Sequence, residues 1–508
     1  MHPRSPYARP DFHPNFEELA KKYPELEPLV AKGKARGSAI DYKDPAALRC
    51  LTTVLLRHDF SLHVELRSDR LCPPVPNRLN YILWLQDLLK EQQRILGVLR
   101  ILLSAVDASL SPPSAKANDV AQGAEHTGCR LPACKRLRME GPAAPAEQTQ
   151  HTLGLDIGTG ASLIYPLLGC ASDASWSFVA TDTDAVSMSH ARATLASADL
   201  LTPIRNFPER IVILQREHKD TALIPSADEL LAIAPPSDGA NEETARRSLG
   251  PLASRLGATA ASSTSSSRAS DRDDVYDFTM CNPPFYGSLA EMRESASFKM
   301  AGPSAACTGS EQEMLTPGGE AAFVGKMIEE SIKLHRMRQT VVAVETNKSM
   351  GAWTCRRTWY TSMLGLRKSV TEVVQKLKVH KIDNYLVTEL LQGETKRWVI
   401  AWSFTYLRLD PLSLGLSPSS CTAFASILPP FPRRDAIIRW ACERRGGSHG
   451  MASGTVHDGD SKRIRQLDDI LASLYGAVHM RRSVRPAADA DQIGPTWHVA
   501  EAGSSSSA

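Results

Sequence analysis

The sequence predicts an α/β fold preceded by a helical N-terminal module, and three observations predict it. Residues 12–100 place apolar side chains at spacings of three and four, which is the period of a helix. The segment 153–169, LGLDIGTGASLIYPLLG, has the order strand, glycine turn, helix. Further apolar strands follow at SFVATD and YDFTMC. Strands that alternate with helices are typical of a mostly parallel sheet covered by helices.

The helical module is expected from three amphipathic stretches. PNFEELAKKYP, DPAALRCLTTVLLRHDF and NYILWLQDLLKEQQRIL each gather apolar residues on one helical face. We therefore assign residues 1–103 to this module and residues 151–408 to the sheet domain. The composition of 104–150 is rich in Ala, Pro and Ser, and 232–274 contains SSTSSSRAS, so both are expected to be disordered insertions. Residues 409–508 are expected to form a poorly ordered tail.

The whole-chain composition excludes several classes of protein. The chain has 508 residues, of which 42% are hydrophobic, enough for two or three globular domains. No run of about 18 apolar residues is present, so we expect no transmembrane helix. The N-terminus lacks the apolar stretch of a secretory signal. The ten cysteines are scattered, which favours free thiols over a zinc site.

The turn after the first strand carries Gly158 and Gly160. Glycine permits a tight turn and lets a ligand approach the backbone closely. Asp156 precedes the turn and is placed to hold the charged amino acid end of a ligand through its backbone or through a water. Asp182 ends the second strand, where an acid typically binds two ribose hydroxyls. The alternative for Asp182 is a helix cap, a role that Asp184 would also serve. These residues predict a nucleotide-type cofactor and leave a nicotinamide and S-adenosylmethionine both open.

The segment 277–287, DFTMCNPPFYG, decides between the two cofactors. Neither proline can donate a ladder hydrogen bond, so the chain must leave the sheet at Asn282. Asn282 therefore lies at the carboxyl edge of the sheet, where ligands bind. The alternative is a proline turn that only ends a strand. Asn-Pro-Pro-aromatic at this place favours methyl transfer to a planar amine.

The chemistry explains the residue types of this motif, which runs through Asn282, Pro283, Pro284 and Phe285. The lone pair of an exocyclic adenine amine is delocalised into the ring, so the nitrogen is a poor nucleophile. The Asn282 side-chain oxygen and the Pro283 carbonyl can accept both N–H groups and favour a pyramidal nitrogen. Phe285 can stack on the base, a contact worth about 1–3 kcal/mol. The protein mainly aligns donor and acceptor.

The last part of the sheet domain combines expected secondary structure with a high positive charge. A helix is expected near AAFVGKMIEESIKL, and residues 356–408 are expected to hold a helix followed by strands. Lys333–Lys381 contains eleven Lys and Arg against two acids, a net charge of +9, whereas the whole chain carries +3. Such a concentration suggests a polyanionic partner, with a solvated helical face as the alternative. The candidate contacts with such a partner are Arg356, Arg357, Arg367 and Lys368 in this segment, together with Arg4 and Arg9 near the N-terminus.

Longer stretches of the sequence are similar to the methyltransferase-like protein 16 family of N6-adenine RNA methyltransferases. They are FEELAKKYPEL, DYKDPAALRCLTTVLLRHDF, VPNRLNYILWLQDLL, LDIGTGASLIYPLLG, YDFTMCNPPF, TPGGEAAFV, RRTWYTSMLG and QGETKRWVIAWSF. The resemblance spans about 12–408. It implies a class I S-adenosylmethionine-dependent methyltransferase sheet, Rossmann-like in form, that joins the helical module in one RNA-binding groove. It also implies U6 small nuclear RNA as the substrate.

The resemblance also implies roles for single residues. Arg78 of NRLNY matches a cofactor-binding arginine, whose forked guanidinium suits the methionine carboxylate, with a structural salt bridge as the alternative. Gly158, Asp182 and Asn282 match cofactor-contacting positions, and Asn282 through Phe285 match the catalytic motif. Thr221 is the candidate for a further cofactor contact before the catalytic segment.

The chain departs from the family in three places. The insertion 104–150 separates the helical module from the glycine turn, and the stretch 338–353 interrupts a short link. Residues 409–508 show no clear equivalent of the C-terminal RNA-binding domains of vertebrate members. We expect a monomer that binds structured RNA, without a metal or membrane, in the nucleus and secondly in the cytoplasm. The open alternatives are a glutamine N5-methyltransferase, a DNA adenine methyltransferase and a non-catalytic RNA-binding protein.

Overall fold

In the computed structural model, the chain forms two compact units. The first contains Met1–Val98 and Ala117–Pro432, and the second contains Leu99–Lys116 and Arg433–Ala508. The structure describes residues 1–8, 15–35, 40–110, 151–197, 207–217, 222–226, 229–230, 275–301, 309–345, 358–392, 395–405, 409 and 414. Of the second unit, the described part is the end of one helix.

Helices dominate the N-terminal part, as the sequence predicts. They are η1 (Pro6–Ala8), α1 (Phe16–Lys22), η2 (Pro24–Leu26), α2 (Glu27–Ala35), α3 (Pro45–Phe60) and α4 (Val75–Leu110). Helix α3 begins where expected for its sequence, because Asp44 accepts a hydrogen bond from the Ala46 amide and Pro45 takes the first helical position. Helix α4 continues through Leu110, beyond the expected boundary at residue 103.

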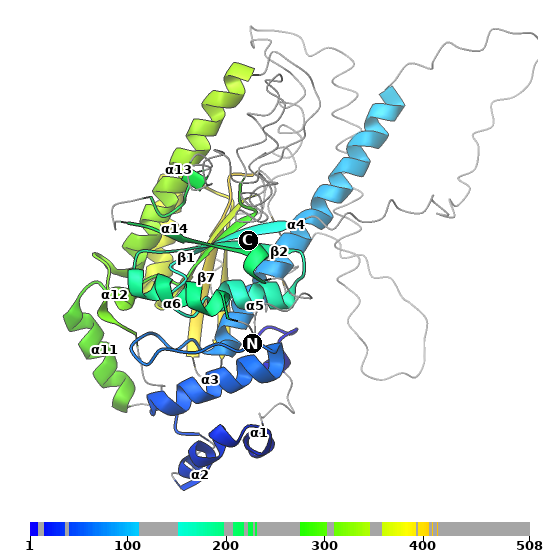
Figure 1. The fold of residues 1–508 in the computed structure, drawn as a ribbon. Coiled ribbons are helices and arrows are strands. Elements are labelled where there is room, and N and C mark those ends of the chain that lie inside the picture. The colour runs from blue at the N-terminus through cyan, green and yellow to red at the C-terminus, as the bar shows by residue number, and fades with distance from the viewer. Residues whose placement is uncertain are drawn as a thin grey trace, which may run out of the picture. The chain divides into compact units, whose positions relative to one another are not determined.

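The sheet domain contains seven strands. They are β1 (Thr152–Ile157), β2 (Trp176–Asp182), β3 (Ile211–Gln215), β4 (Phe278–Cys281), β5 (Trp359–Leu364), β6 (Tyr385–Gln392) and β7 (Thr395–Trp402). Their order in the sheet is β3-β2-β1-β4-β5-β7-β6. The pairs from β3 to β5 are parallel, whereas β7 runs antiparallel to both β5 and β6. Figure 1 shows this sheet with helices around it.

The helices of the sheet domain are α5 (Ile164–Ser172), α6 (Ala185–Leu195), α7 (Phe207–Arg210), α11 (Leu289–Ala301), α12 (Glu311–Met314), α13 (Gly319–Glu345) and α14 (Arg367–Val379). One expectation was incomplete. The segment 356–408 does not begin with a helix in its described part, because WYTSML forms β5 before α14 starts. All six residues of β5 are buried, so the strand lacks the alternation of buried and exposed residues that would mark it in the sequence.

Two hydrophobic cores cover the two faces of the sheet. One contains residues of α3, α4 and α5 together with Phe178, Phe278 and Trp359. The other contains residues of α13 and α14 together with Leu155 and Tyr360. Successive side chains of a strand point to opposite faces, which places the neighbours Trp359 and Tyr360 in different cores. The helical module is therefore packed directly on one face of the sheet.

The strand order places a topological switch point at the carboxyl edge of the sheet. Strand β1 lies between β2 and β4, and α5, which follows β1, covers the opposite face from α13. In open α/β sheets the ligand-binding crevice lies at such a point, and we call the position at the ends of β1 and β4 the crevice. The glycine turn after β1, Asp182 at the end of β2 and the Asn-Pro-Pro-Phe motif after β4 all lie at this edge.

The expected insertion 232–274 lies outside the described residues, as does the part of 104–150 after Leu110. Of the expected tail 409–508, Leu409 and Leu414 are described, and both are buried in the core that contains α4. None of the helices in the described ranges combines the length and the apolar character that crossing a bilayer requires. The same ranges hold no group of three or more His, Cys, Asp or Glu that could bind a metal ion.

Candidate active site

The glycine turn after β1 leaves open space beside its backbone. Gly158 and Gly160 have φ angles of 75° and 65°, in the left-handed region that favours glycine. The amides of Gly158 and Thr159 donate to the Thr181 carbonyl of β2 at 2.9 and 3.0 Å, which holds the turn against the neighbouring strand. A Cβ atom added to Gly158 would meet no heavy atom of the described residues within 4 Å. A ligand can therefore reach this backbone.

Asp156, next to the last residue of β1, is a fully buried acid. Its side chain is fully buried, and neither carboxylate oxygen has a hydrogen bond among the described residues. Burial raises the pKa of Asp156 to about 7; the charge of Asp182 adds to this rise, whereas Thr159 and Arg78 oppose it. An unsatisfied buried carboxyl is costly, so the position suits a cationic or hydrogen-bond-donating group of a ligand.

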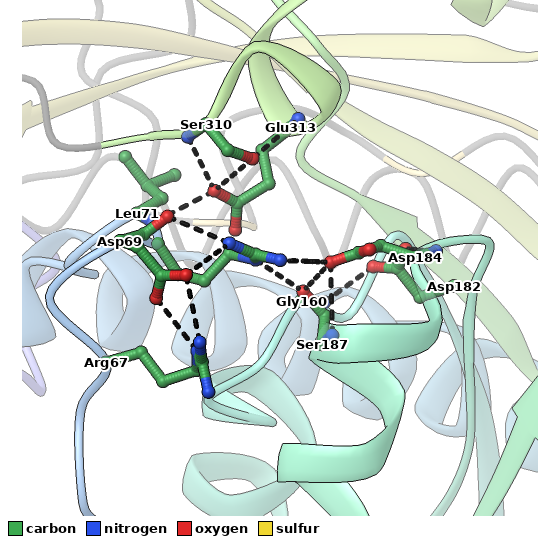
Figure 2. Close-up of polar contacts among 10 residues, drawn as sticks. Arg67, Asp69, Leu71, Gly160, Asp182, Asp184, Ser187, Ser310 and Glu313 are labelled. Atoms are coloured by element: carbon green, nitrogen blue, oxygen red, sulfur yellow. Dashed lines mark hydrogen bonds and ion pairs between the residues drawn. The ribbon is translucent and has the colours of Figure 1, made fainter.

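Asp182 holds the glycine turn, and a different acid caps the next helix. The Gly160 amide donates to Asp182 Oδ2 at 2.9 Å, and the Asp184 amide donates to Oδ1 at 3.0 Å. Asp184 caps α6 by accepting from the Ser187 amide at 3.0 Å. Figure 2 shows both acids beside Gly160 and Ser187. The capping alternative for Asp182 is therefore wrong, while its contact with a ribose stays a prediction. Burial raises the pKa of Asp182.

Arg78 reaches the crevice from α4. It is buried, and its Nη1 donates to the Tyr165 hydroxyl at 2.8 Å while the guanidinium lies over the Tyr165 ring at 5.3 Å. Within the described part of the chain its Nε has no hydrogen-bond partner, and no acidic side chain pairs with its guanidinium. The structural salt bridge offered as the alternative is thus not found there. A free cationic edge at this position suits a carboxylate ligand.

The Asn-Pro-Pro-Phe motif leaves the sheet directly after β4, as its prolines predict. Asn282 is half-buried, and its Oδ1 is buried without a hydrogen-bond partner among the described residues. Pro283 is buried and Pro284 half-buried. The segment beyond is held by paired backbone bonds, from the Tyr286 amide to the Met314 carbonyl and from the Thr316 amide to the Tyr286 carbonyl, each 3.0 Å.

Phe285 is framed by two residues that the sequence did not single out. A Cβ atom on Gly365 would lie 2.9 Å from Phe285 Cδ1, so the ring packs directly on the Gly365 backbone. The Arg397 guanidinium of β7 lies 5.6 Å from the ring centroid. Glu320 accepts from the Gly365 and Leu366 amides at 2.6 and 2.9 Å, which fixes the start of α14 beside Phe285. Burial lowers the pKa of Arg397 and raises that of Glu320.

The expected RNA contacts fall in different places. Arg367 and Lys368 are exposed at the start of α14, next to the Gly365 that supports Phe285. Arg4 donates to Gln86, to the Leu83 carbonyl and to Asp87 on α4, so its guanidinium already serves the helical module. Arg9, Arg356, Arg357 and Thr221 lie outside the described residues. These RNA contacts and Thr221 stay predictions.

Four further residues belong to the crevice or its edges: Tyr165, Glu313, Glu320 and Arg397. Each acts through a contact between segments far apart in the chain, so no local spacing in the sequence marks its role. A partial signal existed for three of them, because Tyr165, Glu320 and Arg397 lie within the stretches LDIGTGASLIYPLLG, TPGGEAAFV and QGETKRWVIAWSF that resemble the family. Glu313 lies outside these stretches and carried no signal.

The unsatisfied groups of the crevice fit S-adenosylmethionine. Asp156 and Asn282 offer buried acceptors, Arg78 offers a cationic donor, and Gly158 leaves room for close approach. A sheet in this order with an antiparallel β7, a glycine turn after β1 and Asn-Pro-Pro-Phe after β4 defines a class I S-adenosylmethionine-dependent methyltransferase. The chain belongs to an RNA methyltransferase family, whose model matches residues 1–111, 141–223 and 267–406.

Known relatives agree with this assignment. The chain is 30% identical to the U6 small nuclear RNA (adenine-(43)-N(6))-methyltransferase of Schizosaccharomyces pombe over 476 residues, which covers 90% of each chain. It is 28% identical to the RNA N(6)-adenosine-methyltransferase mettl16 of Xenopus laevis, covering 80% of this chain but 52% of that relative. The chain thus spans about half the length of its vertebrate relatives. The crystal structure of the hMettl16 catalytic domain with MAT2A 3′UTR hairpin 1 matches with a TM-score of 0.50 and 27% identity, covering 81% of this chain and 98% of that one.

Proposed function

We propose that this chain transfers a methyl group from S-adenosylmethionine to the N6 amine of an adenine in a structured RNA. The observation that carries the proposal is Asn282 Oδ1 directly after β4, which is buried and has no hydrogen-bond partner among the residues that the structure describes. A buried acceptor without a partner needs a donor, and an adenine amine supplies one. The family membership of the chain supports RNA as the source of that adenine.

The residues of the chain account for the reaction as follows. Asn282 Oδ1 and the Pro283 carbonyl accept the two N–H groups of the amine, which turns the nitrogen lone pair toward the methyl group. Phe285 stacks on the base, and Gly365 and Arg397 hold the ring in place. S-adenosylmethionine supplies an electrophilic methyl group, so alignment rather than a strong base provides the catalysis. Arg78, Asp156 and Asp182 orient the donor.

U6 small nuclear RNA is the substrate we propose. The Schizosaccharomyces pombe relative that bears this substrate in its name matches 90% of both chains. The exposed Arg367 and Lys368 beside Phe285 are placed to contact phosphates next to the target base. We further propose that the protein acts as a monomer in the nucleus.

The test supplies labelled S-adenosylmethionine with total RNA, DNA or protein and then with U6 RNA alone. Label in RNA, and in N6-methyladenine after digestion, is the expected result. Label in protein would indicate glutamine methylation, and label in DNA would indicate a DNA adenine methyltransferase. If no pool is labelled, the chain is a binding protein. The Asn282→Ala variant should keep less than about a tenth of the activity and bind RNA like the wild type.

A further inference from the structure

Three segments far apart in the sequence meet beside the glycine turn (Figure 2). They are the connection between α3 and α4 at Arg67–Leu71, the start of α6 at 182–187, and the short helix α12 with its cap at 310–313. The first belongs to the helical module and the other two to the sheet domain. The helical module therefore reaches the edge of the cofactor crevice.

Arg70 connects the helical module to the start of α6 by an ion pair with Asp184. Its Nη2 and Nε donate to Asp184 Oδ2 at 2.9 and 3.1 Å, and Nε also lies 3.1 Å from Ser187 Oγ. The side chains of Arg70 and Asp184 are only 12% and 13% exposed, so solvent screens this ion pair weakly. The connection between α3 and α4 is thereby fixed in position.

Glu313 makes a second connection, between α12 and the helical module, through hydrogen bonds to one carboxylate oxygen. Its Oε2 accepts from the Leu71 amide at 3.0 Å, from the Ser310 amide at 2.9 Å and from Ser310 Oγ at 3.1 Å. Ser310 and Glu313 together form a capping box on α12. All structural contacts of the side chain therefore fall on a single oxygen.

The other oxygen, Oε1, faces the glycine turn. A Cβ atom added to Gly160 would lie 3.8 Å from Glu313 Oε1, and apart from chain neighbours no other heavy atom of the described residues lies within 4 Å of that point. Oε1 has no hydrogen bond within the described part of the chain. The Gly160 amide is held by Asp182. Glu313 Oε1 thus lies beside Gly160, two residues after Gly158, whose backbone is open to a ligand.

We propose that Glu313 is a cofactor-binding residue, whose Oε1 accepts a hydrogen bond from a donor group of S-adenosylmethionine while the Leu71 amide holds Oε2. The donors that this molecule can offer are its ammonium group and its ribose hydroxyls. The proposal rests on the proposed function only for the identity of the methyl donor. It makes the helical module a part of the cofactor site, through the backbone of the connection between α3 and α4.

The electrostatics agree with this role. Burial raises the pKa of Glu313, although three hydrogen bonds and the charge of Arg70 oppose that rise. A donor group arriving at Oε1 would stabilise the carboxylate and offset the burial. Glu311 lies in the same turn of α12 but is exposed, which makes it a matched control.

The experiment measures the binding of S-adenosylhomocysteine by calorimetry for the wild type, Glu313→Gln, Glu313→Ala and Glu311→Gln. Glutamine can still complete the capping box and accept from Leu71, so the thermal stability of the ligand-free Glu313→Gln protein should match the wild type. We expect its affinity to fall by about tenfold, and that of Glu313→Ala by at least as much, because hydrogen bonds to charged groups are the strong ones. Glu311→Gln should bind like the wild type.

A second ligand identifies the donor group. Methylthioadenosine lacks the ammonium group but keeps the ribose hydroxyls, so an unchanged affinity in Glu313→Gln assigns the ammonium, whereas an equal loss assigns a hydroxyl. If both Glu313 variants bind S-adenosylhomocysteine within about twofold of the wild type, Glu313 is only a helix cap and the proposal is wrong. A wild-type protein that fails to bind S-adenosylhomocysteine would instead overturn the proposed function.

Discussion

Asp156 should lower the stability of the cofactor-free protein at neutral and alkaline pH, and Asp156→Asn should relieve this cost. The carboxyl is fully buried without a hydrogen bond among the described residues, and burial raises its pKa from 3.8 to about 7. The folded protein therefore keeps a proton that the unfolded chain loses. Under linkage, the stability due to this group falls as pH rises from about 4 to about 7.

The size of the effect follows from the shift in pKa. Each pKa unit corresponds to about 1.4 kcal/mol. Between about pH 5 and pH 8, the folded protein keeps the Asp156 proton that the unfolded chain has lost over roughly two pH units. The free energy of unfolding of Asp156→Asn should therefore rise relative to that of the wild type by about 2–3 kcal/mol from about pH 5 to about pH 8. Asparagine keeps the size of the side chain, so packing changes little.

The assay is urea unfolding of the cofactor-free protein at both pH values, with Glu372→Gln, an exposed change on α14, as the control. The same variant should bind S-adenosylhomocysteine more weakly, because a neutral amide holds a ligand ammonium less strongly than a carboxylate does. If wild type and Asp156→Asn show the same pH dependence of stability, Asp156 is not held protonated and the reasoning is wrong.

Three further outcomes are expected. Asp182→Ala should weaken S-adenosylhomocysteine binding about tenfold to a hundredfold by calorimetry; an unchanged affinity would limit Asp182 to holding the Gly160 amide. Arg367→Gln and Lys368→Gln should each flatten the log–log salt dependence of RNA binding by about one unit, whereas Lys378→Gln at the other end of α14 should not, and equal slopes in all three would place the RNA elsewhere. Among RNAs with one target sequence, a loop beside a stem should be methylated fastest and a full duplex slowest, because pairing buries the amine; equal rates for the linear strand and the hairpin would rule out recognition of shape.

Local chemistry made much of the site predictable. Gly158 and Gly160 mark a left-handed turn because other residues adopt such φ angles at a cost, and both have positive φ in the structure. The two prolines after Asn282 mark the point where the chain leaves the sheet, since they cannot donate ladder hydrogen bonds. The class I fold and the family were predicted from such motifs and are confirmed.

The motifs and the helical module could be predicted from the sequence, and the motifs also indicated the kind of cofactor, because each depends on neighbours in the chain. Other features became visible in the folded structure alone. It shows that WYTSML forms a buried central strand, that β7 runs antiparallel to its neighbours, and that Asp182 and Asp184 have different roles. It also brought Leu71 and Glu313 together beside the glycine turn. These features depend on contacts between residues far apart in sequence, and no local preference of the backbone or spacing of side chains encodes such contacts.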